Sequence, residues 1–138
     1  MPHVELLICA QGAAIDRFTN SLSIFEFIDE FSPPIYPIFI PKLIIVAMLT
    51  KESNEEDNYE SNIIISIGET ELLKQNVPLN FQGRNRLRQI FNIQFIQVPN
   101  PGTLRIRLEG DKIIGSEYLI ALNPPTQSSI TETQSLPT

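Results

Sequence analysis

The side chains most often used in catalysis and metal binding are scarce in this sequence. Its only histidine and only cysteine are His3 and Cys9. A zinc site needs about four Cys, His or carboxylate ligands, and a lone cysteine forms no intramolecular disulfide. The apolar neighbours of Cys9 supply no base or cation to activate its thiol, and a histidine so near the N-terminus is poorly held for general-base catalysis. The sequence therefore predicts a protein that is not an enzyme and has no catalytic, metal-binding or cofactor-binding residues.

Carboxylates are the remaining groups that could perform acid–base chemistry. Glu26 with Glu117 is one conceivable pair, but a retaining glycosidase needs two carboxyl groups about 5 Å apart, and nothing in the sequence brings these two together. Five further acids lie in segment 51–62: Glu52, Glu55, Glu56, Asp57 and Glu60. They lack the Asp-x-Asp-x-Asp-Gly spacing of a calcium loop, which indicates a solvated acidic loop.

Half of the ten basic residues are arginines in the second half of the chain: Arg84, Arg86, Arg88, Arg105 and Arg107. If the turn at Asn100 joins a hairpin, pairing Phe95 with Ile106 keeps core residues opposed and places the arginines on one sheet face, spread along it. Phe91 and Phe95 then point to the other face, so the aromatic platform of a single-strand nucleic-acid binder is missing. We expect a solvated face whose arginines pair with carboxylates, and no nucleic-acid partner.

Alternating or continuous apolar runs predict the strands that position these groups. In the first half of the chain the expected strands are 4–11, 22–28, 43–49 and 62–67, with a buried helix as the alternative for 43–49. Asp16 and Asn20 have the chemistry of a hairpin connection. Four prolines between Pro33 and Pro41 indicate an extended crossover rather than a ladder strand. Residues 69–83 fit either a short helical turn or a loop.

Three more strands are expected at 87–95, 104–108 and 115–122. About seven strands with closely spaced turn signals and little helix predict an all-β fold, an antiparallel β-sandwich. We expect this domain to span residues 1–123. Residues 124–138 are rich in Ser, Thr, Gln and Pro and predict a disordered tail, with a docking peptide as the alternative.

Composition agrees with one acidic domain. The 138 residues are 42% hydrophobic, with 10 Lys and Arg against 16 Asp and Glu and a net charge of -6. Such a charge disfavours nucleic-acid phosphates and anionic lipid as partners. The start of the chain lacks a basic signal-peptide region, and the longest apolar stretch, 35–49, is interrupted by Pro37, Pro41 and Lys42. We expect a cytoplasmic protein without a membrane partner.

Two blocks of the sequence have a familiar order. The first runs from Val4–Cys9 through Asp16-x-x-Thr19-Asn20-Ser21-Leu22-Ser23-Ile24-Phe25 to Phe39–Leu43, and the second from Val98-Pro99-x-Pro101-Gly102 to Leu108, followed by Ile114-Gly115-Ser116. These blocks resemble a family of small bacterial proteins known only as a domain of unknown function. The resemblance covers residues 4–122 in outline, except for 51–83. It implies a compact β-sandwich in a bacterial cytoplasm and transfers no chemistry.

The function predicted from these patterns is a non-enzymatic module for protein–protein interaction or self-assembly. This prediction depends on an excess of apolar residues at strand positions that share a face with polar residues. A contiguous exposed apolar patch marks a surface that binds a partner. The candidate surface comprises Ile24, Glu26, Ile28, Arg86, Arg88, Ile90, Ile96, Arg105 and Arg107. The alternative is a small-molecule or carbohydrate-binding module, for which the aromatic residues in expected loops are Tyr36, Tyr59, Phe18 and Phe81.

Overall fold

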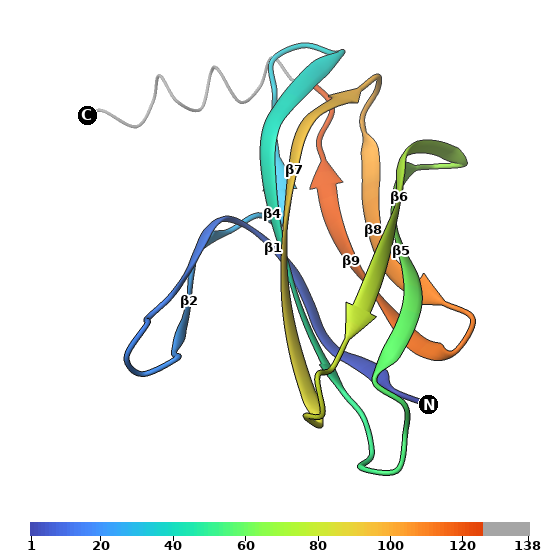
Figure 1. Cartoon of the computed structure of the whole chain (residues 1–138). Helices are drawn as coiled ribbons and strands as arrows, with labels where there is room; N and C mark the ends of the chain where they lie inside the picture. The colour runs from blue at the N-terminus through green and yellow to red at the C-terminus, as the bar shows by residue number, and fades with distance from the viewer. Residues whose placement is uncertain (126–138) are drawn as a thin grey trace.

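Residues 1–125 are described by a computed structural model and form strands joined by turns and loops, without a helix in that part of the chain (Figure 1). The strands are β1 (His3–Ile15), β2 (Leu22–Phe27), β3 (Glu30–Phe31), β4 (Ile38–Thr50), β5 (Asn58–Ile67), β6 (Thr70–Asn80), β7 (Arg86–Val98), β8 (Gly102–Gly110) and β9 (Ile113–Leu122). The predicted all-β class is confirmed. The tail predicted for residues 124–138 lies, from residue 126 onwards, outside the described residues.

The strands build one nine-stranded sheet in the order β6-β5-β8-β9-β1-β4-β7, with β2 paired to β1 and β3 paired to β9. The sheet is nearly closed and barrel-like, so the predicted sandwich of two separate sheets is wrong. The two groups of strands form one sheet because β1 pairs with β9. His3 pairs with Ile114 in parallel, and Ile114 donates its N–H to the Pro2 carbonyl at 2.8 Å. We call β1, β2, β4 and β7 the first half of the sheet, and β5, β6, β8 and β9 the second half.

The core lies between the two halves and is made of inward-facing residues from both. On β4, Leu43, Ile45 and Leu49 are fully buried, and on β8 Leu104 and Ile106 are as well. Such β-branched and aliphatic side chains favour strands and pack well on a pleated surface. The predicted strand at 43–49 is therefore confirmed, and the alternative of a buried helix is excluded.

Two proline-containing segments are strands, contrary to expectation. β4 begins at Ile38, so Ile38–Pro41 belong to the ladder with β7 and the predicted crossover ends earlier. Residues 69–83 contain β6, which pairs with β5 throughout and includes Pro78. Proline is tolerated in β6 because this strand ends the sheet, where a missing N–H breaks no second ladder.

The predicted β7–β8 hairpin is wrong. β7 pairs with β4 along its whole length, from Arg86 opposite Thr50 to Val98 opposite Ile38. β8 pairs instead with β5 and β9. The turn at 99–101 therefore connects the two halves of the sheet, and Phe95 does not pair with Ile106.

The alternation of inward-facing and outward-facing side chains along β7 is interrupted at Phe95, which has a φ of +59° and is 73% exposed. It lies across from Pro41, between the pairs Ile40–Ile96 and Lys42–Gln94. Inward-facing Ile93 is consequently followed by inward-facing Ile96, instead of Phe95. The expectation that Phe95 belongs to the core face is wrong for this reason.

The predicted hairpin between the first two strands is confirmed and forms an arm, residues 11–27, that projects from the sheet (Figure 1). The Asp16 carboxylate accepts hydrogen bonds from the backbone N–H groups of Phe18 and Thr19 at 2.8 and 3.2 Å. These bonds lower the pKa of Asp16. Asn20 adopts a φ of +59°, which asparagine tolerates in turns.

Candidate interaction surface

Exposed phenylalanines are the most unusual feature of this surface. Five of the eight in the chain are more than half exposed: Phe18 (95%), Phe25 (52%), Phe27 (62%), Phe39 (65%) and Phe95 (73%). We call these five the aromatic surface. All lie on the hairpin arm, β4 or β7, that is, in the first half of the sheet. Large aromatic side chains are normally buried, so such a concentration calls for a reason beyond folding.

The hairpin arm presents its aromatic residues opposite small ones. Phe25 pairs with Gly12, and a Cβ added to Gly12 would lie 3.7 Å from the Phe25 ring. Phe27 pairs with Ala10. The turn of the arm contacts β7, because Arg88 donates a hydrogen bond to the Asn20 carbonyl at 3.1 Å. The arm is therefore held against the outer side of the first half at its turn as well as at its base.

The outer face beneath the arm is apolar too. Phe27 and Ala10 are in register, Ala10 pairs with Ile44, and Ile44 with Asn92. Ala10 and Ile44 are buried, although they lie outside the core cluster. Directly paired residues share a face of the sheet, so Phe27, Ala10 and Ile44 form an outward-facing apolar row that ends at the polar Asn92.

Two opposite charges lie within the aromatic surface. Glu26 stands between Phe25 and Phe27 and has a φ of +56°. Lys42 pairs with Gln94, the residue before Phe95. Both are exposed, and neither forms an ion pair within residues 1–125.

The predicted interaction residues divide between surface and core. Glu26 and Ile90 are exposed and Ile24 is partly exposed, all in the first half of the sheet. Ile28 and Ile96, however, are only 5% and 4% exposed and belong to the core cluster, so they are not part of an outer surface. Ile28 leaves the arm and donates its N–H to the Cys9 carbonyl, and Ile96 turns inward after the break at Phe95.

The arginines occupy two separate places rather than one shared stretch. Arg105 and Arg107 lie on β8 and contact the carboxylates of Glu117 and Glu109, at 3.2 and 3.6 Å. Arg86 lies on β7, 3.4 Å from the Glu5 carboxylate, and Arg88 contacts the hairpin turn. Because β7 and β8 do not pair, the expected common face of five arginines does not exist.

The sequence analysis missed the aromatic surface itself. Phe25 and Phe27 share a parity on β2, with Phe18 in the turn, and Gly12 and two alanines lie opposite. That combination is a usable signal of an exposed aromatic hairpin. Phe39 and Phe95 give no such signal, because their exposure depends on the local break at Pro41 and Phe95.

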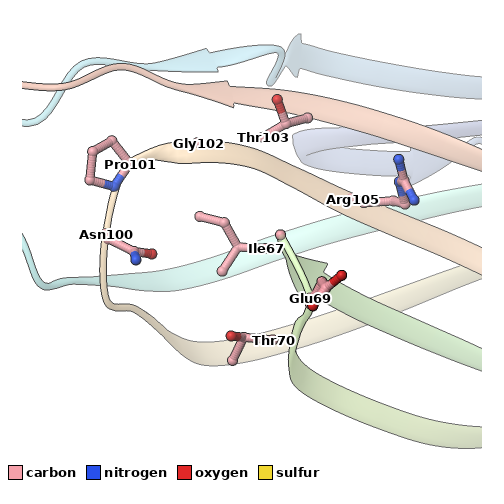
Figure 2. Close-up of a pocket in the computed structure, with 9 residues that line it drawn as sticks. Ile67, Glu69, Thr70, Asn100, Pro101, Gly102, Thr103 and Arg105 are labelled. Atoms are coloured by element: carbon pink, nitrogen blue, oxygen red, sulfur yellow. The ribbon is translucent and has the colours of Figure 1, made fainter.

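Several hollows lie elsewhere on the surface. One, of about 480 Å³, lies between the β5–β6 and β7–β8 turns. Figure 2 shows Asn100 and Pro101 on one turn, Glu69 and Thr70 on the other, and Ile67 between them. No aromatic side chain lines this hollow, so it lacks the stacking platform that the carbohydrate hypothesis requires.

The aromatic residues expected in carbohydrate-binding loops do not gather at one site. The Tyr36 hydroxyl donates to the Asn123 carbonyl at 2.8 Å, and burial raises its pKa. Tyr59 lies on β5 and packs edge-to-face on buried Phe81, with ring centroids 6.0 Å apart. Of the four, only Phe18 is exposed.

The sparse nucleophiles and acids are likewise held in structural contacts. Cys9 is fully buried, and its burial raises the pKa of the thiol to about 12. His3 lies beside the Thr50 hydroxyl, and Glu117 pairs with Arg105. Residues 1–125 contain no group of three or more His, Cys, Asp or Glu side chains arranged to hold a metal ion. That part of the chain also contains no helix that could cross a bilayer.

In comparisons with known proteins, the chain matches no family model, no curated protein and no solved structure. The resemblance to a bacterial family of unknown function therefore stays a prediction. What this protein does has to be argued from its own surface.

Proposed function

We propose that this protein is a non-enzymatic self-association module, in which the aromatic surface contacts the same surface of a second copy. The observation that carries the proposal is the exposure of five phenylalanines, all in the first half of the sheet. An aromatic surface without net charge can meet a copy of itself, as a two-fold dimer interface requires.

The size of the aromatic surface fits such a contact. At about 200 Å² per phenylalanine, the exposed rings offer on the order of 600 Å² per copy. A stable dimer of standard size buries about 800 Å² per partner. The rings and the flanking apolar residues, such as Ile90, together approach that value.

The two opposite charges within the aromatic surface fit a second copy as the partner. A chain with net charge -6 repels its own copies, so a self-contact has to be neutral or internally compensated. The aromatic surface contains Glu26 and Lys42, both exposed. In a two-fold contact, Glu26 of each copy meets Lys42 of the other, and the contact carries no net charge.

The test is the mass of the full-length protein in solution, measured by sedimentation equilibrium over a range of concentrations. We expect a dimer for the native chain and a monomer for the double variant Phe25→Ser/Phe27→Ser. Leu119→Ser is the matched control, because Leu119 is 47% exposed on β9, in the second half of the sheet. A native chain that stays monomeric at millimolar concentration overturns the proposal.

Charge exchange tests the two-fold arrangement separately. Glu26→Lys and Lys42→Glu should each weaken association by about tenfold or more, since each places like charges in contact. The double variant Glu26→Lys/Lys42→Glu should restore most of the native affinity. Lys112→Glu, in the β8–β9 turn, is the control and should have no effect. Failure of the double variant to recover contradicts the Glu26–Lys42 pairing.

A further inference from the structure

A second site lies beside the hairpin turn and is lined by none of the five phenylalanines of the aromatic surface. It is a groove of about 620 Å³ between the turn, Met48 of β4 and the chain from Asn80 to Gln89. Arg84, Arg86 and Arg88 all line it. Arg86 and Arg88 lie two residues apart on β7 and therefore point to the same side, about 7 Å apart. Arg84 lies in the loop before β7 and lines the same groove.

The groove is positively charged within an acidic protein. No carboxylate is among its lining residues, which include amide side chains such as Asn20 and Gln82. Within residues 1–125, the one acid that forms an ion pair with these arginines is Glu5, 3.4 Å from Arg86, with both side chains solvent-exposed. An exposed pair at this distance contributes little and leaves the arginine available. The Asp57 carboxylate accepts a hydrogen bond from the Gly83 N–H beside Arg84, and it is paired with Lys51.

The other two arginines are also available for a ligand. Arg88 uses one nitrogen to bind the Asn20 carbonyl, which fixes its direction toward the turn. The Arg84 side chain forms no ion pair or hydrogen bond with the described part of the chain. Arg105 and Arg107 on β8 each contact a carboxylate, as Arg86 does, whereas Arg84 and Arg88 form no ion pair within residues 1–125. Three guanidinium groups with at most one acid among them leave a net attraction for anions.

We infer that this groove binds a small molecule carrying two or more phosphate groups. Guanidinium groups bind phosphate oxygens in pairs, and three arginines lining one groove suit an extended diphosphate better than a single carboxylate. Met48 and Leu87 provide apolar contacts for the rest of the ligand. Nucleic acid fits less well, because Phe81, the one aromatic residue in the lining, is 1% exposed and offers no ring for base stacking.

The experiment uses the full-length chain and inorganic pyrophosphate, with binding followed by calorimetry at low salt. We expect binding that Arg84→Gln weakens by at least tenfold and that Arg105→Gln leaves unchanged. Arg84 is exposed in a loop, so its replacement leaves the fold intact. Arg88→Gln should weaken binding as well, but it also releases the hairpin turn and is therefore the secondary variant.

Three outcomes overturn the inference. They are no binding of pyrophosphate at millimolar concentration, an equal loss in Arg84→Gln and Arg105→Gln, and tight binding of a single-stranded oligonucleotide in the absence of pyrophosphate binding. The Phe25→Ser/Phe27→Ser variant provides an independent check. Its pyrophosphate affinity should match that of the native chain, because neither phenylalanine lines the groove.

Discussion

Strand β4 of the first half and strand β8 of the second half differ on their outer sides. Both have fully buried inward-facing residues, such as Ile45 and Ile106. The outward positions of β8 are Arg105 and Arg107, each paired with a carboxylate. The outward positions of β4 include Ile44 and Val46, which are 7% and 0% exposed but lie outside the core cluster.

In the second half of the sheet, charged side chains keep the outer face solvated. Ile64 on β5 faces outward between Arg107 and Lys74, its partners in register, and is only 6% exposed. Aliphatic stems of long charged side chains cover such a residue while their heads stay in water. The first half uses phenylalanine and isoleucine in comparable places. Because Ile44 and Val46 are already buried, the part of this outer face that remains available for a partner is the exposed aromatic surface.

The end strands of the sheet differ in the same sense. β6 carries Glu71, Lys74 and Pro78, which protect an open edge against pairing with other chains. β7 has no charged residue from Gln89 to Val98. Both edges belong to one sheet, yet charge is spread along the edge in the second half and confined to Arg86 and Arg88 in the first half. This difference agrees with a contact role for the first half.

The largest expected effect is the loss of stability when an inward-facing core side chain is removed, and this loss should be similar in the two halves of the sheet. Ile45→Ala on β4 and Ile106→Ala on β8 each remove a fully buried side chain, and each should lower the free energy of unfolding by about 2–5 kcal/mol. Urea denaturation should show one cooperative transition for both variants. A separate transition for one half would contradict a shared core.

A smaller effect concerns the inner face of β1. Because burial raises the pKa of Cys9 to about 12 from its ordinary 9.0, the folded chain keeps this proton while the unfolded chain loses it above pH 9. Stability should therefore be unaffected below pH 9 and fall between pH 9 and 12, by at most about 1.4 kcal/mol per pH unit. Urea denaturation of the native chain and of Cys9→Ala at several pH values measures this. Equal slopes above pH 9 would mean that the thiol reaches solvent in the folded state.

Local chemistry made much of the fold predictable from the sequence. The runs at Leu43–Leu49 and Asn62–Ile67 are apolar on both parities, as in strands covered on two sides, and they form β4 and β5. The turn at Asp16 follows from a side chain that bonds its own backbone. These features depend on residues close together in the chain.

The errors came from features that depend on distant residues. The turn after Val98 has hairpin chemistry, but β7 pairs with β4 and β8 with β5, strands that lie far away in the chain. Pro78 argued against a strand, yet it is harmless at the end of a sheet, and the strand order was not known. Of the predicted surface residues, Glu26 and Ile90 are exposed, whereas Ile28 and Ile96 are buried in the core, because faces switch where the backbone departs from regular alternation.

Phe95 offers the smallest effect and the sharpest test of the comparison, because stability and association should change in opposite directions. Its φ of +59° is unfavourable for a bulky side chain and acceptable for asparagine. Its ring is 73% exposed and contributes little to the core. Phe95→Asn should therefore raise the free energy of unfolding of the monomer by up to about 1 kcal/mol while weakening self-association. Urea denaturation at low protein concentration measures the free energy of unfolding, and sedimentation equilibrium measures self-association.

A variant that is both less stable and more weakly associated would assign Phe95 to the core, whereas one that is more stable and equally associated would remove β7 from the contact. The expected result, a more stable and less associated chain, would mean that this strained residue is kept for its contact with a partner and not for folding.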